Sequence, residues 1–381
     1  MKILFDFINL QQGIVGSAVY TYKVLNALCT KRQGDMSIIG LYDSKKRPDN
    51  YNIFSFSNKK KIELVDVNSY SCVSDLIDDL NIDCFFIACG QYYKAYDLSG
   101  IRCRSIIVIH DLSDCELDDN RLSDYFFDKY LQRFKPYWIW LFNLLLIRRK
   151  YAFDYSSISN FIQLPSVTLV TVSLYTKYAF EYYMSKLKKN VYVLYPPLKE
   201  TVEFDSIKNN VLKNIIQENR KFYLVVSANR PTKNARMVIE TFKNSSLRED
   251  DTFLITVGYP NKLYDRHILL PVLSDSDLEY AYKYAYALIF PSITEGFGYP
   301  PLEAMKYGTP AICSNVCSMP EIYKDSVLWF SPFYKNALYQ QIRTLEENYE
   351  IYKMKSKAQY EKIAIRQKQD LDKLIDLIIY G

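Results

Sequence analysis

The chain has 381 residues, of which 49% are hydrophobic and 24% charged, and its net charge is +5. At roughly 100–200 residues per domain, this length predicts two globular domains, and so mild a positive charge does not indicate a nucleic-acid-binding protein. Eight scattered cysteines without a CxxC pair and only two histidines argue against a Cys/His zinc site. We interpret the thiols as reduced groups of a cytosolic protein.

The first half of the chain alternates strand-like and helix-like segments. Residues 2–8 (KILFDFI) are strand-like, residues 9–17 (NLQQGIVGS) form a loop, and residues 18–31 have a helical period. Further strand-like runs follow at MSIIGLYD, KIELVDV, IDCFFIAC, RSIIVIHDL, VTLVTVS and VYVLYPP. Strands that alternate with helices predict a parallel α/β sheet.

A second α/β segment follows a break in this pattern. Residues 195–206 (YPPLKETVEFDS) combine two prolines with charges and are a candidate linker. Strand-like runs then resume at KFYLVVSANR, TFLITVGYP, YALIFPS, TPAICSN and SVLWFSP, and the tail from about residue 335 is charged and helical. We predict one domain over residues 1–198, a second over 199–360, and a C-terminal helix over 361–381 that packs back on the first.

The most informative stretch is PSITEGFGYPPLEAMKYGTP, residues 291–310. Glu295 precedes a glycine-rich strand-to-helix loop, and Glu303 falls in the first turn of the helix that Pro301 suits. Gly296 and Gly298 let a ligand approach the backbone, and free N–H groups at a helix start favour a phosphate. The structural alternative is that Glu303 only complements the helix dipole and Glu295 is a solvated loop residue.

This stretch, with its continuation AICSNVCSMPEI, resembles the motif of retaining glycosyltransferases of the GT-B fold, specifically glycosyltransferase family 4. The resemblance implies two Rossmann-like domains facing a cleft, an acceptor-side domain followed by a nucleotide-sugar-binding domain. It implies that Glu295 contacts hydroxyls of the donor sugar and Glu303 the ribose. Backbone groups of the loop residues would face the sugar and diphosphate: Gly296, Phe297 and Gly298. Tyr299 stands where the family more often has an aliphatic residue.

Two basic residues follow another strand, in SANRPTKN at residues 227–234. Arg230 and Lys233 could stabilise a leaving diphosphate without a metal through charge-assisted hydrogen bonds. The family has an arginine and a lysine here in that role, although Asn234 replaces the usual glycine. The alternative is that both are solvated loop residues.

Other candidates lie in the first half of the chain. His110 and Asp111 follow a strand, and the resemblance places a similar histidine near the donor sugar, with Asp111 orienting it or meeting the acceptor. A structural histidine is the alternative. Gly13 and Gly16 lie in a short loop that is otherwise an ordinary tight turn, and the family has a glycine-rich loop there that approaches the donor phosphates.

Residues 133–150 (RFKPYWIWLFNLLLIRRK) are apolar with basic ends. They suit either an interfacial helix on anionic lipid or a buried helix of the first domain. Their apolar core is shorter than the about 20 residues that a bilayer span needs.

The sequence therefore predicts a cytosolic retaining glycosyltransferase, which would be peripheral at the inner face of the cytoplasmic membrane if residues 133–150 are the interfacial helix and not the buried one. It would move a hexose, without metal or cofactor, from a nucleotide-diphosphate sugar to a glycan acceptor that is lipid-linked. GDP-mannose and dTDP-rhamnose are the favoured donors, because the motifs look most like bacterial polysaccharide and O-antigen transferases. Two alternatives are a non-catalytic GT-B-fold scaffold and a sugar-nucleotide epimerase, which lacks the glutamate motif.

Overall fold

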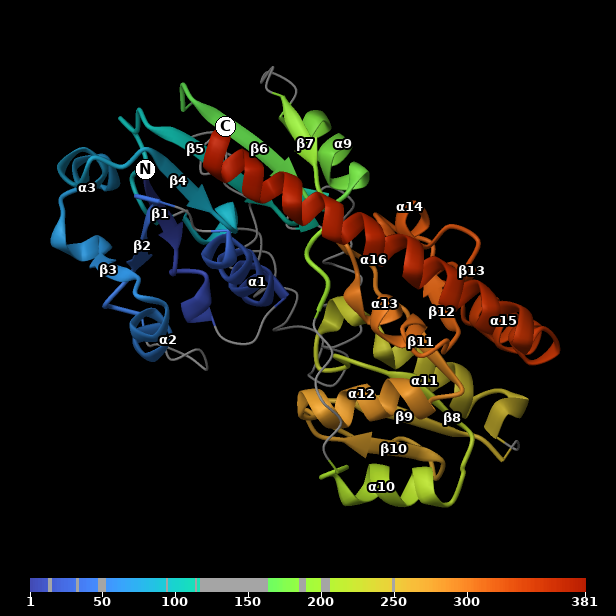
Figure 1. Ribbon diagram of the computed structural model, residues 1–381. Helices are drawn as coiled ribbons and strands as arrows, with labels where there is room; N and C mark the ends of the chain where they lie inside the picture. Colours follow the sequence, from blue (N-terminus) through green and yellow to red (C-terminus); the bar gives the residue numbers. More distant parts are fainter. Residues whose placement is uncertain are drawn as a thin grey trace, which may run out of the picture. The chain divides into compact units, whose positions relative to one another are not determined.

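The computed structural model describes residues 1–12, 16–31, 34–46, 53–93, 95–113, 115–116, 164–184, 190–199, 206–248 and 251–381. These residues form two compact units (Figure 1). Unit 1 contains the described residues up to Leu198 together with residues 366–381, and unit 2 contains residues 199–365.

The described part of unit 1 is built on a parallel sheet of seven strands in the order β3-β2-β1-β4-β5-β6-β7. This is a Rossmann-like order, in which the strand order across the sheet reverses between β1 and β4. The strands are β1 (Lys2–Asp6), β2 (Ser37–Tyr42), β3 (Glu63–Asp66), β4 (Cys84–Ile87), β5 (Arg104–Ile109), β6 (Val167–Thr171) and β7 (Val191–Val193).

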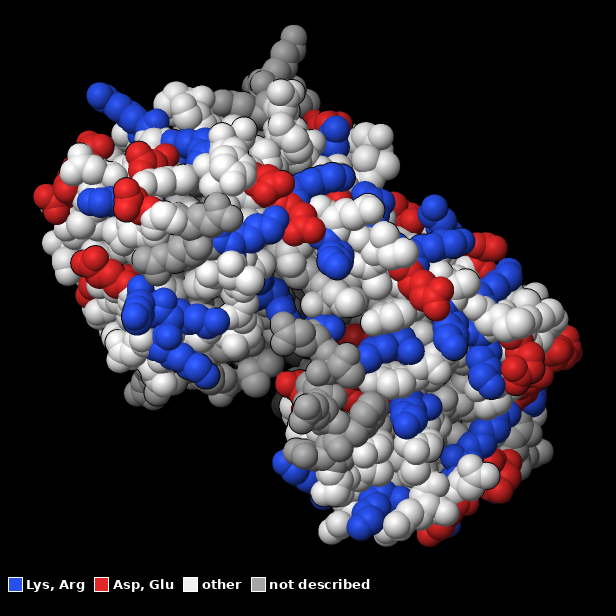
Figure 2. All heavy atoms as spheres, in the orientation of Figure 1, with Lys and Arg blue, Asp and Glu red and all other residues white. Residues whose placement is uncertain are grey.

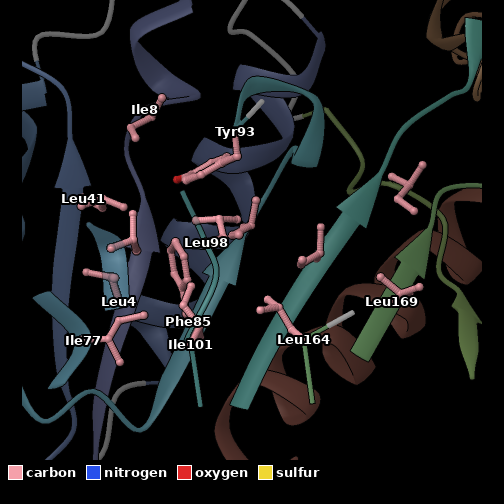
Figure 3. Close-up of a cluster of buried hydrophobic side chains, with 14 of the residues drawn as sticks. Leu4, Ile8, Leu41, Ile77, Phe85, Tyr93, Leu98, Ile101, Leu164 and Leu169 are labelled. Atoms are coloured by element: carbon pink, nitrogen blue, oxygen red, sulfur yellow. The ribbon is translucent and has the colours of Figure 1, made fainter. Parts of the chain in front are cut away.

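Helical segments of unit 1 connect these strands, as the alternating pattern predicts. They are η1 (Leu10–Gln12), α1 (Gly16–Thr30), α2 (Ile53–Lys60), η2 (Val67–Ser69), α3 (Val73–Leu80), η3 (Gly90–Tyr93) and α9 (Leu174–Tyr183). Side chains from the sheet and the connecting segments form a buried apolar core, in which Leu4, Phe85 and Tyr93 are fully buried (Figure 3). The expected loop at residues 9–17 is wrong in part, because η1 lies within it and Gln11 hydrogen-bonds the backbone of Asp43.

The described part of unit 2 has a parallel sheet of six strands in the order β10-β9-β8-β11-β12-β13. The strand order across this sheet reverses between β8 and β11. The loops after these two strands therefore meet at the carboxyl edge, where ligands bind in such sheets. The strands are β8 (Phe222–Val225), β9 (Phe253–Val257), β10 (His267–Leu270), β11 (Ala287–Phe290), β12 (Ala311–Ser314) and β13 (Leu328–Phe330).

The helical segments of unit 2 include the predicted tail. They are α10 (Asn210–Gln217), η5 (Pro231–Lys233), α11 (Ala235–Lys243), η6 (Ser246–Arg248), α12 (Asp275–Tyr284), α13 (Tyr299–Met305), α14 (Met319–Tyr323), α15 (Lys335–Glu347) and the start of α16 (Tyr349–Tyr380). A second buried core joins α11 and α15 to the sheet through Val238, Phe242 and Leu338.

The last residues of α16 belong to unit 1. Arg104 of β5 donates to the carbonyl oxygens of Leu377 and Ile378 at 2.9 and 2.8 Å, which satisfies acceptors that a helix end leaves unpaired. The carboxylate of Asp370 accepts from the backbone N–H of Tyr195 at 2.9 Å. These contacts fix the helix end to the sheet of unit 1.

All eight cysteines are free thiols, and four of them are buried: Cys84, Cys89, Cys115 and Cys313. On the face shown in Figure 2, basic and acidic side chains lie interspersed over both units. No helix in the described ranges has the length and apolar character to cross a membrane. Residues 133–150, for which we predict a helix, lie outside these ranges.

Candidate active site

The loop between β11 and α13 carries the first glutamate of the predicted pair. Gly298 ends this loop with a φ of 79°, in the left-handed region that favours glycine. A Cβ atom there would lie 2.6 Å from the Sδ atom of Met319. The hydroxyl of Tyr323 donates to the carbonyl of Gly298, so α14 also holds this point of the loop. Both the backbone conformation and the nearby Met319 therefore favour glycine at this position.

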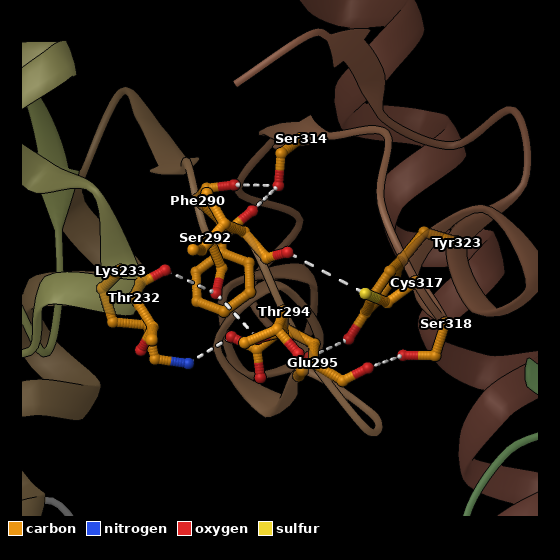
Figure 4. A network of polar contacts seen from close by, with 12 residues as sticks. Thr232, Lys233, Phe290, Ser292, Thr294, Glu295, Ser314, Cys317, Ser318 and Tyr323 are labelled. Carbon is orange, nitrogen blue, oxygen red and sulfur yellow. Dashed lines mark hydrogen bonds and ion pairs between the residues drawn. The ribbon is translucent and has the colours of Figure 1, made fainter. Parts of the chain in front are cut away.

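The carboxylate of Glu295 forms an ion pair with the ammonium group of Lys233, as Figure 4 shows. Both side chains are 12% exposed. The carbonyl oxygen of Glu295 accepts a hydrogen bond from the hydroxyl of Ser318 at 2.9 Å, which fixes the backbone. The structure thus brings together two predicted site residues. The family resemblance assigns Glu295 to the donor sugar and Lys233 to the diphosphate.

The loop after β8 is bonded directly to the loop after β11. The backbone N–H of Ile293 donates to the carbonyl of Thr232 at 2.9 Å, and the hydroxyl of Ser292 donates to the same oxygen at 3.3 Å. Asn234 adopts a φ of 47° and donates its side-chain N–H to the carbonyl of Pro332 at 2.9 Å. Asparagine is among the few residues besides glycine that tolerate this conformation, which explains why it can replace the family's glycine.

Arg230 lies in the same loop but differs from Lys233 in its surroundings. Its side chain is exposed, and its backbone N–H donates to the carbonyl of Ser227 at 3.2 Å. Lys233 is largely buried, and its ammonium group also lies 5.1 Å from the centre of the Phe290 ring. The two cations are therefore not equivalent in the free protein.

Glu303, on α13, is 8% exposed. Its Oε2 atom accepts from the hydroxyl of Tyr282 on α12 at 2.6 Å, and its Oε1 atom forms an ion pair with Lys199. We did not identify Lys199 or Tyr282 from the sequence, because neither belongs to a local motif. Phe297 is buried and Tyr299 packs beside it, with ring centres 5.3 Å apart.

In unit 1, His110 and Asp111 lie directly after β5. The Nε2 atom of His110 is 2.9 Å from the carbonyl of Ala88 and must carry a proton to donate there, so this nitrogen is not a free base. Burial lowers the pKa of His110. The carboxylate of Asp111 accepts from the N–H and hydroxyl of Ser113 at 3.1 and 2.6 Å, and from Gln91 at 3.3 Å. Both side chains are held by the segment that follows β4, through Ala88 and Gln91, and Asp111 is also held by Ser113 of its own loop.

Gly16 is the first residue of α1, and Gly13 lies outside the described residues. A Cβ atom at position 16 would meet no atom of the described residues within 4 Å. The described part of the chain therefore gives no steric reason for glycine at this position.

Asp6, at the carboxyl end of β1, is a buried polar residue that our sequence analysis did not assign to the site. Its carboxylate accepts from the backbone N–H groups of Asn9 and Ala88 at 2.9 and 3.1 Å, and from the hydroxyl of Tyr93 at 2.9 Å. Burial nevertheless raises its pKa to about 6. Asp6 ties the first loop to β4 where the sheet reverses direction.

Among the described residues, no group of three or more His, Cys, Asp or Glu side chains is arranged to hold a metal ion. The positive charges at the candidate site come from side chains: Arg230 and Lys233 in the loop after β8, and Lys199 beside Glu303.

Comparison with known proteins agrees with this fold. Residues 206–363 match the family model of glycosyl transferases group 1. The O-antigen chain mannosyltransferase RfbU of Salmonella typhimurium is 30% identical over 177 residues, which are 41% of this chain and 49% of RfbU. The O-antigen chain mannosyltransferase B of Escherichia coli is 48% identical over 63 residues, 16% of each chain. The chain thus spans about half of the first relative and less of the second.

The fold is similar over the whole length to a solved structure. Anabaena Alr3699/HepE, determined in complex with UDP and glucose, superposes with a TM-score of 0.67 at 13% identity, covering 98% of this chain and 99% of that one. These findings confirm the predicted α/β GT-B fold with two Rossmann-like domains. The match of residues 206–363 to the model of group 1 glycosyl transferases confirms the resemblance that the glutamate motif indicated.

Proposed function

We propose that the protein is a retaining glycosyltransferase that moves a mannosyl group from GDP-mannose to a glycan acceptor in surface polysaccharide synthesis. The observation that carries the proposal is the Lys233–Glu295 pair on two bonded loops at the reversal point of the unit 2 sheet. The family match of residues 206–363 and the O-antigen mannosyltransferases among the relatives support it. We keep dTDP-rhamnose as the second donor to test.

In this proposal the loops of unit 2 hold the donor. Glu295 accepts hydrogen bonds from sugar hydroxyls, Glu303 accepts from the ribose, and backbone groups of Gly296–Gly298 face the sugar and diphosphate. A hydroxyl oxygen of the acceptor attacks the anomeric carbon on the face that the diphosphate leaves. The bond from that carbon to the diphosphate oxygen breaks, and the leaving group keeps the electron pair and takes the acceptor proton.

Arg230 and Lys233 stabilise the negative charge that develops on the diphosphate, so the reaction needs no metal ion. Lys233 is pre-paired with Glu295 in the free protein. When the donor binds, this ion pair is replaced by a hydrogen bond from a sugar hydroxyl to Glu295 and an ion pair between Lys233 and the diphosphate.

Unit 1 receives the acceptor in this proposal. Gly16, the first residue of α1, and Gly13 contact the donor phosphates and the acceptor in this proposal. His110 positions the reacting groups through its ring or backbone, because its Nε2 atom already donates to Ala88. The acceptor is lipid-linked, and residues 133–150 contact the anionic membrane surface.

A binding experiment followed by a transfer assay tests the proposal. GDP, UDP, dTDP and ADP are added to the purified protein with and without EDTA, and the melting temperature is measured. A ligand at about 100 times its dissociation constant adds roughly 2.7 kcal/mol of stability. We expect GDP to stabilise the protein equally with EDTA, and GDP-mannose to be consumed with an acceptor glycan. Stabilisation without any transfer would instead favour a non-catalytic scaffold.

A further inference from the structure

The carboxylate of Glu303 is fixed from two sides by residues of different segments. The hydroxyl of Tyr282 on α12 donates to Oε2 at 2.6 Å, and the ammonium group of Lys199, which precedes α10, pairs with Oε1. Because each carboxylate oxygen is held by a different group, the plane of the carboxylate cannot rotate freely.

The two buried glutamates of this region, Glu279 and Glu303, each pair with a different lysine. Glu279, one turn before Tyr282 on α12, pairs with Lys306 at 2.7 Å and accepts from the hydroxyl of Tyr307. Among the described residues, Lys199 is the cation that pairs with Glu303. A buried carboxylate is costly unless it is paired, so the ion pair with Lys199 offsets the cost of burying the side chain of Glu303.

Lys199 itself remains charged in this place. Burial alone would lower the pKa of Lys199, but the charge and hydrogen bond of Glu303 outweigh it and the pKa is raised. The carboxylates of Asp275 and Glu279 act in the same direction. Its side chain is 36% exposed, and its ammonium group lies 5.8 Å from the centre of the Tyr299 ring.

Glu303 keeps capacity for a ligand. An ionised carboxylate has about four acceptor positions, and Tyr282 and Lys199 use one on each oxygen. The remaining positions suit a pair of neighbouring hydroxyl groups, such as those of a ribose.

We propose that Lys199 is a positioning residue of the donor site, which holds the carboxylate of Glu303 in the orientation that accepts the ribose hydroxyls of the nucleotide. The inference rests on the proposed function, because it takes the ligand to be a nucleoside diphosphate. In this proposal Lys199 acts through Glu303. The effect of Lys199 on nucleotide affinity therefore depends on the ribose hydroxyls and not on the rest of the nucleotide.

The test compares two ligands that differ only in those hydroxyls. Binding of GDP and of 2′,3′-dideoxy-GDP is measured by calorimetry for the wild type, Lys199→Met and Lys199→Arg; if UDP or ADP is the nucleotide that binds, its own pair is used. Lys199→Met should weaken GDP binding by about 10- to 100-fold, the scale of losing hydrogen bonds to a charged group. It should leave dideoxy-GDP binding unchanged, and Lys199→Arg should restore most of the loss.

The control is Lys306→Met, which removes the cation of the neighbouring carboxylate Glu279. It should not change the ratio between the two ligands. If Lys199→Met does not fold, the variant Lys199→Met/Glu303→Gln removes the buried charge altogether. The ratio of the dissociation constants of GDP and dideoxy-GDP should then be the same in this double variant as in Glu303→Gln alone.

Equal weakening of both ligands by Lys199→Met, or no weakening of either, would overturn the inference and leave Lys199 a purely structural residue. So would a further change of the ratio in the Glu303→Gln background. These outcomes differ from failure of the proposed function, in which the wild type binds none of the four nucleoside diphosphates. That result would remove the inference together with its basis.

Discussion

The ammonium group of Lys233 and the carboxylate of Glu295 form an ion pair in which both side chains are 12% exposed. The resemblance assigns them to different parts of the donor, the diphosphate and the sugar. In the free protein they neutralise each other across two loops that follow the central strands β8 and β11. Loss of either partner therefore affects stability as well as the proposed chemistry.

Replacing Glu295 by Ala should reduce turnover by at least about 10²-fold, because a preorganised contact to the reacting sugar is lost. It should also destabilise unit 2 by about 1–3 kcal/mol, since Lys233 stays largely buried without its partner. The double variant Lys233→Met/Glu295→Gln should recover the stability and not the activity. Unfolding in urea and initial rates of sugar transfer measure the two effects separately.

Glu240→Gln is the matched control for this pair. Glu240 pairs with Arg236 and Lys335 on the surface of unit 2, where ion pairs contribute little. Turnover of Glu240→Gln should equal that of the wild type. Wild-type turnover of Glu295→Ala would remove Glu295 from the mechanism.

Replacing Arg230 by Ala should lower turnover by about 10²-fold and leave stability unchanged. Its guanidinium group is exposed, so nothing buried loses a partner, while the leaving diphosphate loses one charge contact. Steady-state rates and a melting curve check both parts. Arg220→Ala, which removes a surface cation paired with Glu218, should change neither quantity. A melting temperature that falls in Arg230→Ala would mean that the side chain has a structural role.

Much of this site could be predicted because its signals are local. The spacing of Glu295 and Glu303, the proline at the start of α13 and the glycine at position 298 all lie within one strand-loop-helix unit. Hydrophobic periodicity predicted the alternating strands and helices for the same reason.

Contacts between distant segments could not be predicted in this way. Lys199 and Glu303 are far apart in the sequence, and they meet only because the fold places Lys199 beside α13. Asp6 is an acidic residue in an apolar strand, and its role depends on the pairing of β1 with β4. A single sequence without such pairings gives no sign of either contact.

Replacing Gly298 by Ala should destabilise unit 2 more than replacing Gly308 by Ala. Both glycines have a positive φ, 79° and 75°, so each substitution carries a backbone cost of about 1–2 kcal/mol. At Gly298 the new methyl group also meets Met319 at 2.6 Å, whereas at Gly308 the nearest atom lies 3.7 Å away. The extra cost at Gly298 should be about 1–3 kcal/mol. Urea unfolding of both variants gives the comparison, and equal costs would show that the loop yields to the added methyl group.

Asp6 should make the stability of unit 1 depend on pH. Burial raises its pKa from 3.8 to about 6, so the folded protein holds the proton more tightly than the unfolded chain does. Its contribution to stability is therefore most favourable below pH 4, falls as the pH rises to about 6, and is level above that. Two pKa units correspond to at most about 3 kcal/mol. Asp6→Asn cannot titrate and should lose this dependence.

Hydrogen–deuterium exchange of peptides from β1 and β4 measures this effect at pH 4.5, 5.5 and 7, with wild type and Asp6→Asn compared at each pH. The amide of asparagine faces the N–H of Ala88 less well than a carboxylate oxygen does, so a constant offset between the two proteins is expected. The prediction is that this difference in amide protection changes with pH. As the pH rises, protection should shift in favour of Asp6→Asn. Asp35→Asn, at an exposed position, should follow the wild type. An offset for Asp6→Asn that stays constant from pH 4.5 to 7 would mean that the three hydrogen bonds keep Asp6 ionised throughout this range.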